Sequence, residues 1–295
     1  FVNRVRKQIH YSRAEKEQLT GYHIGVGVLD SGIFPHEDLK DQIRAFRDFT
    51  NKYQLPYDET GHGTHVCGIL AGNGRVLHGK YKGMAPCCDL YVGKILNKRG
   101  EGSLKTLLRG LQWLLSIAES CNIRVINISV SSIASARPEE QRKLYELFQY
   151  AYENNILIVT AAGNFGPGDN TISRLGDTPY VICVGCHDGD LENGGLRCQD
   201  CSGRGPGENV WKKPDVVAPG TQIISCQAAY GKYVARSGTS MATPIVSGLL
   251  ALACEKYPYL TAMQLKRKLI ISATDLGESY LMQGAGMVDV EKMLS

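Results

Sequence analysis

The feature that most constrains this chain is a charge-free run near its C-terminal end. No residue between Ser237 and Cys254 is charged, and most residues after Pro244 are small or apolar. A helix without a polar stripe has to be buried on every side, so this run predicts a helix through the protein interior. Pro244 fits the first turn of such a helix, where its missing N–H costs little. Ser240 would then lie at the helix N-terminus, the part expected to reach a surface.

Ser240 has two possible roles at this position. Backbone N–H groups in a first helical turn lack partners within the helix, and the helix dipole favours negative charge there. A hydroxyl at such a place could attack a carbonyl group and find donors for the oxyanion that develops. A serine before an apolar run is also a common N-cap. This stretch alone leaves both roles open.

Apolar segments of strand length alternate with amphipathic segments of helical length along the rest of the chain. Strands are predicted at 22–29, 89–96, 124–130, 156–162, 180–185, 222–226 and 232–236. Helices are predicted at 4–19, 61–72, 103–115, 138–154 and 261–273. This alternation is typical of an α/β fold, in which helices cover both faces of a mostly parallel sheet. The 295 residues show no linker, so we expect one domain over 1–295, with 1–20 as an N-terminal lead segment.

Charge and hydropathy argue against some classes of partner. A net charge of +4 is mild for this length and gives no reason to expect nucleic acid or a membrane surface as partner. No apolar run reaches the ~18 residues of a membrane span. The chain starts at Phe1 rather than Met, so we expect an upstream segment to have been removed. The oligomeric state is left open by the composition.

The chain has ten cysteines, which is many for a domain of this size. Several lie within apolar patterns, such as Cys183 in a strand and Cys254 at the end of the buried helix, which favours free thiols and a cytoplasmic location. Two C-x-x-C pairs could together hold zinc: they are Cys183, Cys186, Cys198 and Cys201. Residues three apart on a strand point to opposite faces, so we expect no zinc there.

An aspartate and a histidine also lie at ends of predicted elements, as Ser240 does. Asp30 ends the first predicted strand, and ligand sites in open α/β sheets lie at the carboxyl ends of strands. His62 lies in the first turn of the second predicted helix, and His65 follows three residues later on the same face. A metal site formed by these two histidines lacks an acidic partner on the helix. A local turn role for Asp30 stays open.

Six stretches of the chain follow one another in a distinctive order. They are VGVLDSGI around Asp30, GHGTHVCGILAG around His62, VINISV from Val125, TAAGNFG around Asn164, KPDVVAPG from Lys213 and SGTSMATPIVSG around Ser240. Together they resemble the motifs of the subtilisin family of serine proteases, from about Gly21 to the C-terminus. The resemblance implies a three-layer, subtilisin-like α/β fold and hydrolysis of peptide bonds.

The resemblance also implies a role for each matching residue. Ser240 would be the nucleophile, His62 the general base and acid, and Asp30 the carboxylate that orients the imidazole. Asn164 would donate to the oxyanion together with the backbone N–H of Ser240, although an asparagine between glycines also forms turns. His65 matches a second, noncatalytic histidine of the family.

An extended peptide substrate is expected to lie between two segments of the chain, as in strand addition. One segment runs from Gly100 to Gly102 and the other from Ser129 to Ser131. The residues that the resemblance assigns to substrate binding are Gly100, Glu101, Gly102, Leu104, Leu107, Ser129, Val130, Ser131, Ala162, Gly163 and Ser173. Leu104 and Leu107 also fit ordinary core positions.

Three stretches depart from the family pattern. Ser131 and Ser132 replace a usual glycine, and the sequence SRLGD from Ser173 replaces a proline-containing turn, which would reshape the primary pocket. The sequence GNGRVLHGKYKG replaces an asparagine-rich calcium loop. Asp38 remains nearby, but one carboxylate does not make a six- to eight-oxygen calcium site. We therefore expect no required cofactor, and the loop sequence does not support calcium.

The leading hypothesis is a serine endopeptidase that acts through an acyl-enzyme intermediate on peptide or protein substrates. The altered pocket leaves open a maturation protease of narrow specificity for one leader or precursor. A catalytically inactive binding module, or a structural role stapled by zinc, would be alternatives of another class. The family resemblance also implies a removed N-terminal propeptide as a partner.

Overall fold

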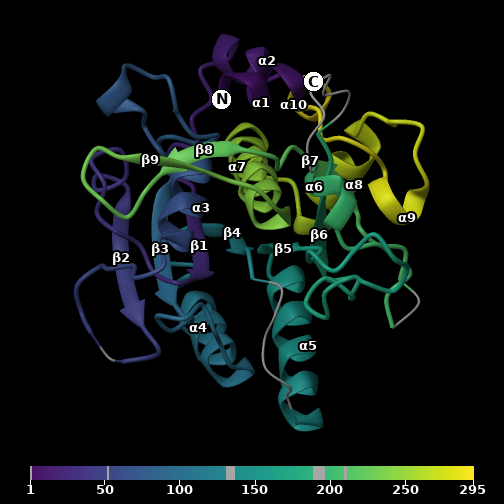
Figure 1. The fold of residues 1–295 in the computed structure, drawn as a ribbon, viewed down its shortest axis with the longest axis horizontal. Coiled ribbons are helices and arrows are strands. Elements are labelled where there is room, and N and C mark those ends of the chain that lie inside the picture. The colour runs from purple at the N-terminus through teal and green to yellow at the C-terminus, as the bar shows by residue number, and fades with distance from the viewer. Residues whose placement is uncertain (1, 52, 131–136, 189–196, 209–210) are drawn as a thin grey trace.

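A computed structural model describes residues 2–51, 53–130, 137–188, 197–208 and 211–295 of the chain. A seven-stranded parallel sheet, with strand order β2-β3-β1-β4-β5-β6-β7, forms its centre (Figure 1). The strands are β1 Gly25–Asp30, β2 Ile43–Asp48, β3 Asp89–Lys94, β4 Ile123–Ile128, β5 Leu157–Ala161, β6 Val181–Cys186 and β7 Val216–Ala218. Outside this sheet, β8 Ile223–Cys226 pairs with β9 Tyr233–Arg236 in antiparallel fashion.

Helices cover both faces of the sheet, as the α/β pattern predicts. α3 (His62–Ala71) and α7 (Thr239–Lys256) pack together on one face, and α4 (Leu104–Ile117) and α5 (Pro138–Glu153) pack on the other (Figure 1). Successive residues of β5 alternate between the two cores: Leu157 and Val159 face α3 and α7, whereas Ile158 faces α4 and α5. The predicted three-layer α/β architecture is confirmed.

The remaining helices surround this centre. They are α1 Val2–Gln8, α2 Ser12–Lys16, α6 Cys198–Cys201, α8 Ala262–Ser272, α9 Tyr280–Gln283, α10 Val290–Met293 and the 3-10 turn η1 Arg75–Leu77. The lead segment thus forms two helices instead of one, because His10 between them adopts a left-handed backbone with φ 54°. Within the described residues, no helix combines the length and apolar character needed to span a bilayer.

The charge-free helix α7 is buried almost throughout, as predicted. Only Ser240, near its start, and the two residues at its C-terminal end escape full burial. Pro244 is the sixth residue of α7, so its predicted place in the first turn is wrong. The helix begins at Thr239, and the ring of Pro244 removes one hydrogen bond beyond the orphan N–H groups of the first turn.

Two of the ten cysteines are paired, whereas the apolar surroundings of several of them favoured free thiols. Cys186 at the end of β6 and Cys198 at the start of α6 form a disulfide with a Cα–Cα distance of 5.7 Å. That separation lies within the range that a disulfide requires. The other eight cysteines are free, and the Cys183 thiol packs instead against Gly176.

Candidate active site

Three adjacent strands bring the predicted site residues to one edge of the sheet. β1, β4 and β5 are parallel neighbours, so their carboxyl ends meet there. Asp30 is the last residue of β1, Ser129 directly follows β4, and Asn164 lies three residues beyond β5. α3 begins with His62, and Ser240 is the second residue of α7. The chain therefore presents these five residues from strand ends and helix starts.

His62 and Asp30 are in direct contact. His62 Nδ1 lies 2.7 Å from Asp30 Oδ1, which also accepts a hydrogen bond of 2.7 Å from the backbone N–H of Ser31. Asp30 is fully buried, whereas 24% of the His62 side chain is exposed. Burial lowers the pKa of His62, but the charge and hydrogen bond of Asp30 raise it, and the net pKa is above the ordinary value. A proton on Nδ1 leaves Nε2 as an acceptor toward the pocket that His62 lines.

The hydroxyl of Ser240 is directed toward the end of β4. Ser240 Oγ donates to the carbonyl oxygen of Ser129 at 2.7 Å. A serine hydroxyl has one proton to donate, so in this structure that proton is given to Ser129 and not to His62. Ser240 and His62 nevertheless line the same pocket of about 320 Å³.

The side-chain amide of Asn164 is oriented by the residue that precedes Ser240. Asn164 Oδ1 accepts from the backbone N–H of Thr239 at 3.1 Å and from its hydroxyl at 3.2 Å. A backbone N–H can only donate, so the atom facing it must be the amide oxygen, and Nδ2 has no hydrogen-bond acceptor among the described residues. Gly238, with φ 137°, allows this approach, because a Cβ there would lie 3.3 Å from Asn164 Oδ1.

Asp58 holds the start of α3 in place, a role that the sequence did not reveal. Its carboxylate accepts from the Ser31 hydroxyl at 2.8 Å, from the Gly61 N–H at 2.9 Å and from the Thr64 N–H at 2.8 Å. A carboxylate that accepts orphan N–H groups stabilises a helix start. Asp58 thereby fixes His62 relative to the strand end at Asp30. Its place shortly before a predicted helix was the available signal.

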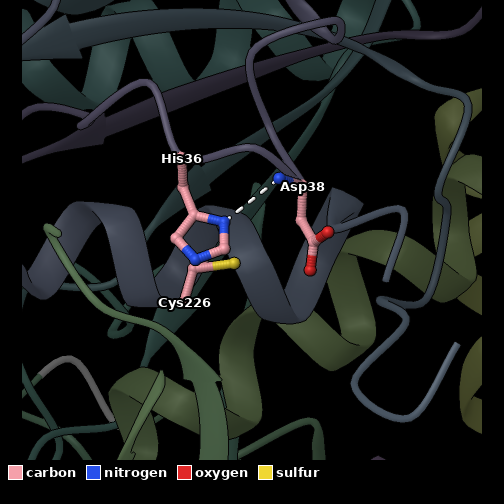
Figure 2. A group of neighbouring side chains, drawn as sticks. All are labelled: His36, Asp38 and Cys226. Atoms are coloured by element: carbon pink, nitrogen blue, oxygen red, sulfur yellow. Dashed lines mark hydrogen bonds between the residues drawn. The ribbon is translucent and has the colours of Figure 1, made fainter. Parts of the chain in front are cut away.

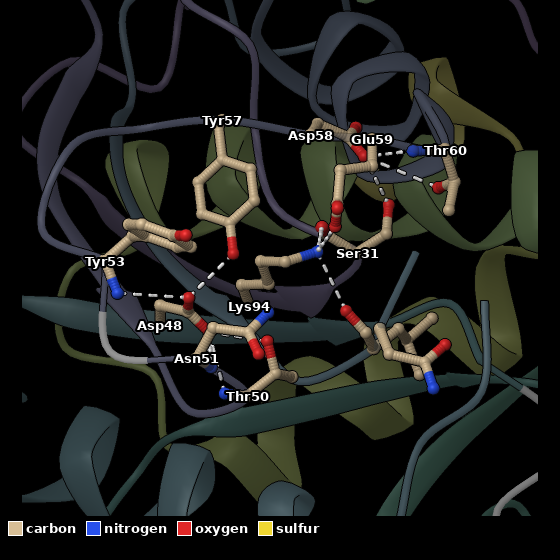
Figure 3. A network of polar contacts seen from close by, with 12 residues as sticks. Ser31, Asp48, Thr50, Asn51, Tyr53, Tyr57, Asp58, Glu59, Thr60 and Lys94 are labelled. Atoms are coloured by element: carbon tan, nitrogen blue, oxygen red, sulfur yellow. Dashed lines mark hydrogen bonds and ion pairs between the residues drawn. The ribbon is translucent and has the colours of Figure 1, made fainter. Parts of the chain in front are cut away.

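Lys94, the last residue of β3, is a fully buried cation under the same edge (Figure 3). Its Nζ donates to the carbonyl oxygens of Ser31 at 2.6 Å and Leu96 at 2.8 Å, and it lies 3.3 Å from a Glu59 carboxylate oxygen. A buried charge is tolerated when it is paired and hydrogen-bonded in this way. Lys94 joins the turn after Asp30 to Leu96, which lines the pocket.

His65 is not among the residues that line the pocket, and two hydrogen bonds hold its ring against other backbone groups. Its Nε2 lies 3.0 Å from the carbonyl oxygens of both Ile223 and Val234. Two acceptors require a proton on Nε2, and burial lowers the pKa of His65 to about 3. The neutral ring therefore ties α3 to the β8–β9 pair.

The predicted substrate-binding residues fall into three groups. Gly100, Ser129 and Val130 line the pocket, and Glu101 and Gly102 follow in the same exposed loop. Leu104 and Leu107 lie in the core beneath it, in a cluster that also contains Leu96 and Val130. Ser131 lies outside the described residues.

Ala162, Gly163 and Ser173 are buried together at the end of β5. The Ser173 hydroxyl donates to the carbonyl oxygen of Ala161, and its N–H donates to that of Ala162, both at 2.7 Å. A Cβ at Gly163 would lie 3.5 Å from Ser173 Cβ. These contacts bring Ser173 against the strand that leads to Asn164.

A buried cluster of His36, Asp38 and Cys226 offers the types of ligand atom that a transition metal binds (Figure 2). Both ring nitrogens of His36 are already used, since Nδ1 accepts from the Asp38 N–H and Nε2 donates to the Lys232 carbonyl, each at 3.1 Å. Asp38 accepts from the Val76 N–H at 2.9 Å and from a tyrosine hydroxyl at 2.6 Å. A metal ion would have to displace these bonds, so the cluster does not fit one.

A second buried group consists of Cys186, Asp188 and Cys198. The two sulfurs form the disulfide, and Asp188 accepts from the backbone N–H groups of Gly220 at 3.1 Å and Thr221 at 2.9 Å. The donor atoms are therefore engaged within the protein. The absence of a required metal, and of zinc or calcium in particular, stays a prediction.

Comparison with known proteins places the chain in one family. A profile of the subtilase family matches residues 21–288. Serine protease AprX of Bacillus subtilis (strain 168) is 35% identical over 93% of this chain and 67% of its own length. Subtilisin DY of Bacillus licheniformis is 33% identical over 95% of this chain and 94% of its own length.

Solved structures agree with the sequence comparison. Sphericase superimposes with a TM-score of 0.80 and 30% identity, and the match covers 92% of each chain. The S41 psychrophilic protease also gives a TM-score of 0.80, at 29% identity and with the same coverage of both chains. The chain is a hydrolase of peptide bonds and belongs to the subtilase family of serine proteases.

Proposed function

We propose that the protein is an endopeptidase in which Asp30, His62 and Ser240 form a catalytic triad. The observation that carries this proposal is the 2.7 Å contact between His62 Nδ1 and Asp30 Oδ1 beside a pocket that His62 shares with Ser240. A serine hydroxyl needs a base to take its proton and a carboxylate to hold that base in the right tautomer.

Catalysis would begin when the Ser240 side chain rotates from Ser129 toward His62. Oγ then attacks the scissile carbonyl carbon, and its proton passes to His62 Nε2. The C–N bond breaks as His62 returns that proton to the leaving amine, which leaves an acyl group on Ser240 Oγ. Water, deprotonated by His62, then cleaves this ester and regenerates the free hydroxyl.

Asn164 Nδ2 and the backbone N–H of Ser240 would hold the oxyanion of each tetrahedral intermediate. The orientation that Thr239 imposes on Asn164 supports this role, because donors aimed in advance need no reorganisation during the reaction. The substrate backbone would pair with residues 100–102 and 129–131 as an added strand. The upstream residues would then lie beside the pocket.

Labelling with a peptidyl phosphonate diester tests the proposal directly. We expect one label per chain on Ser240, loss of both label and peptidase activity in Ser240→Ala, and retention of both in Ser120→Ala. Ser120 is an exposed serine beyond the end of α4 and serves as the matched control. Stoichiometric labelling at another residue, or activity retained in Ser240→Ala, would contradict the assignment.

A further inference from the structure

The pocket beside His62 and Ser240 has a basic rim. Lys98 and Arg99 line it together with Leu96, and no lining residue among those described is acidic. Both cationic side chains are exposed. The pocket that His62 and Ser240 share therefore has positive charge and an apolar wall.

The turn that carries these cations is held by its own hydrogen bonds. Asn97 Oδ1 accepts from the backbone N–H groups of Arg99 at 2.9 Å and Glu101 at 3.1 Å, and the Asn97 N–H donates to the Glu101 carbonyl at 2.9 Å. Gly100 supplies the left-handed backbone that the turn needs, with φ 75°. Lys98 and Arg99 are thus displayed from a fixed backbone, which lowers the entropic cost of binding a ligand.

Neighbouring carboxylates are engaged elsewhere. Glu59 pairs with the buried Lys94 at 3.3 Å, and Glu101 accepts from the Asn97 side-chain amide at 3.1 Å. Across the described residues, neither Lys98 nor Arg99 forms an ion pair. The hydrogen bond from Asn97 leaves the negative charge on Glu101. Because Glu101 pairs with neither cation, Lys98 and Arg99 remain available to a ligand.

We propose that this rim selects peptide substrates with an aspartate or glutamate at the second residue upstream of the scissile bond. The inference rests on the proposed function, which puts the scissile carbonyl between His62 and Ser240 and the upstream strand on residues 100–102. A guanidinium group binds a carboxylate through two parallel hydrogen bonds, and a lysine adds a mobile point charge. The aliphatic stem of a glutamate can lie against Leu96.

Three peptides that differ only at the second upstream residue test the inference. We expect kcat/KM to fall from the Glu peptide to the Gln peptide and again to the Lys peptide, by about fivefold per step at low ionic strength. The differences should shrink in roughly 1 M salt, because exposed charges are screened over about 3 Å there. Equal values for the Glu and Gln peptides at low salt would overturn the inference and leave the proposed function intact.

Charge-reversal variants assign the effect to the rim. K98E/R99E should invert the order of the three peptides, and K98Q/R99Q should abolish it. The control K16E/R267E makes the same change of charge on α2 and α8 and should keep the original order. Lys16 neighbours Glu17, which pairs at 2.6 Å with Lys256 near the end of α7, and 16 helical residues place that end about 24 Å from Ser240. An order unchanged in K98E/R99E, or inverted in the control, would contradict the inference.

Binding to Ser240→Ala gives a readout that does not need catalysis. Fluorescence anisotropy should show tighter binding of the Glu peptide than of the Gln peptide, by about fivefold. This difference should disappear when K98Q/R99Q is combined with Ser240→Ala in the same chain. Failure of the wild-type protein to hydrolyse any peptide or to take up the phosphonate would count against the proposed function alone. Equal binding of the Glu and Gln peptides would count against the rim alone.

Discussion

Two regions border the same pocket but are built in different ways: the edge of the sheet near His62 and Ser240, and the basic rim of Lys98 and Arg99. At the edge, Asp30 is buried and hydrogen-bonded to His62, and Asp58 fixes the start of α3. At the rim, Lys98 and Arg99 are exposed and the turn that carries them is held mainly by one asparagine. The proposed chemistry, which tolerates little displacement, lies on strand ends and helix starts, whereas the proposed recognition lies on a loop. Substitutions at the edge should therefore slow the hydrolysis of every substrate. Substitutions at the rim should change the rates of some substrates relative to others.

The largest expected effect belongs to Asp30→Asn. An amide in place of the carboxylate would no longer stabilise the imidazolium or select the tautomer with the proton on Nδ1. We expect kcat to fall about 10⁴-fold, the loss known for the orienting carboxylate of a serine protease triad, for neutral and charged peptides alike.

The matched control for that variant is Asp41→Asn, which breaks an exposed ion pair with Arg75 at 2.9 Å. Steady-state kinetics on the Glu, Gln and Lys peptides should show normal kcat in this control. A fall in kcat of less than tenfold in Asp30→Asn, or a fall for only one of the peptides, would contradict the expected difference between the edge and the rim.

Asn164→Ala should lower kcat by about 10²- to 10³-fold with little change in KM, the range established for the corresponding donor of subtilisin. The donor acts on charge that develops in the transition state, so ground-state binding should be retained. Asn154→Ala, at the exposed end of α5, is the control. Equal turnover in Asn164→Ala would remove this residue from the oxyanion hole.

Asp58→Asn should affect stability more than recognition. Asp58 Oδ2 accepts from both the N–H and the hydroxyl of Thr64, at 2.8 and 2.6 Å, and an amide has only one oxygen to serve the donors around it. A buried donor left unpaired costs about 1–3 kcal/mol, so we expect a drop of that size in the free energy of unfolding. Urea denaturation measures it, with Asp41→Asn as control. An unchanged midpoint would show that α3 does not depend on this carboxylate.

The smallest expected effect is a shift in pH dependence. His62 has to be neutral to accept the Ser240 proton, and its pKa is raised by Asp30 against the effect of burial. Hence kcat/KM for the Gln peptide should rise with pH around a midpoint above the usual histidine value of about 6.5. In Asp30→Asn the main effects that raise the pKa of His62 are lost, so the midpoint of the residual activity should move down. A higher midpoint in that variant would contradict the assigned cause.

The same raised pKa has a consequence for folding. His62 binds its proton more tightly in the folded chain, so this group stabilises the fold fully below its unfolded pKa. That contribution is lost as pH rises through the folded pKa.

Most residues at this edge of the sheet could be predicted from the sequence, because they lie at strand ends and helix starts that local sequence patterns mark. Asp30 ends an apolar run, and His62 and Ser240 open helices of small and apolar residues. Contacts between distant segments had no such signal: Asn164 meets Thr239 75 residues later, and Asp58 meets Ser31 27 residues earlier. Such pairings depend on how the strands are ordered, which periodicity does not specify.

The missed elements have a similar explanation. β2 mixes arginines with apolar residues because it is an edge strand with a half-exposed pattern, so its polar character masked it. The Cys186–Cys198 disulfide joins a strand end to a short helix across a segment without periodicity. The charge of the rim was visible in the sequence, but its position at the pocket required the fold of the turn.

The order of the central strands has one more consequence. β4 lies directly between β1 and β5. The lateral separation of β1 and β5 is therefore set by two interstrand spacings of about 4.8 Å each. The sheet therefore sets the distance between Asp30, at the end of β1, and the end of β5 that leads to Asn164, the proposed oxyanion donor. Loops around the pocket could be exchanged or lengthened to accept new substrates while this distance stays the same.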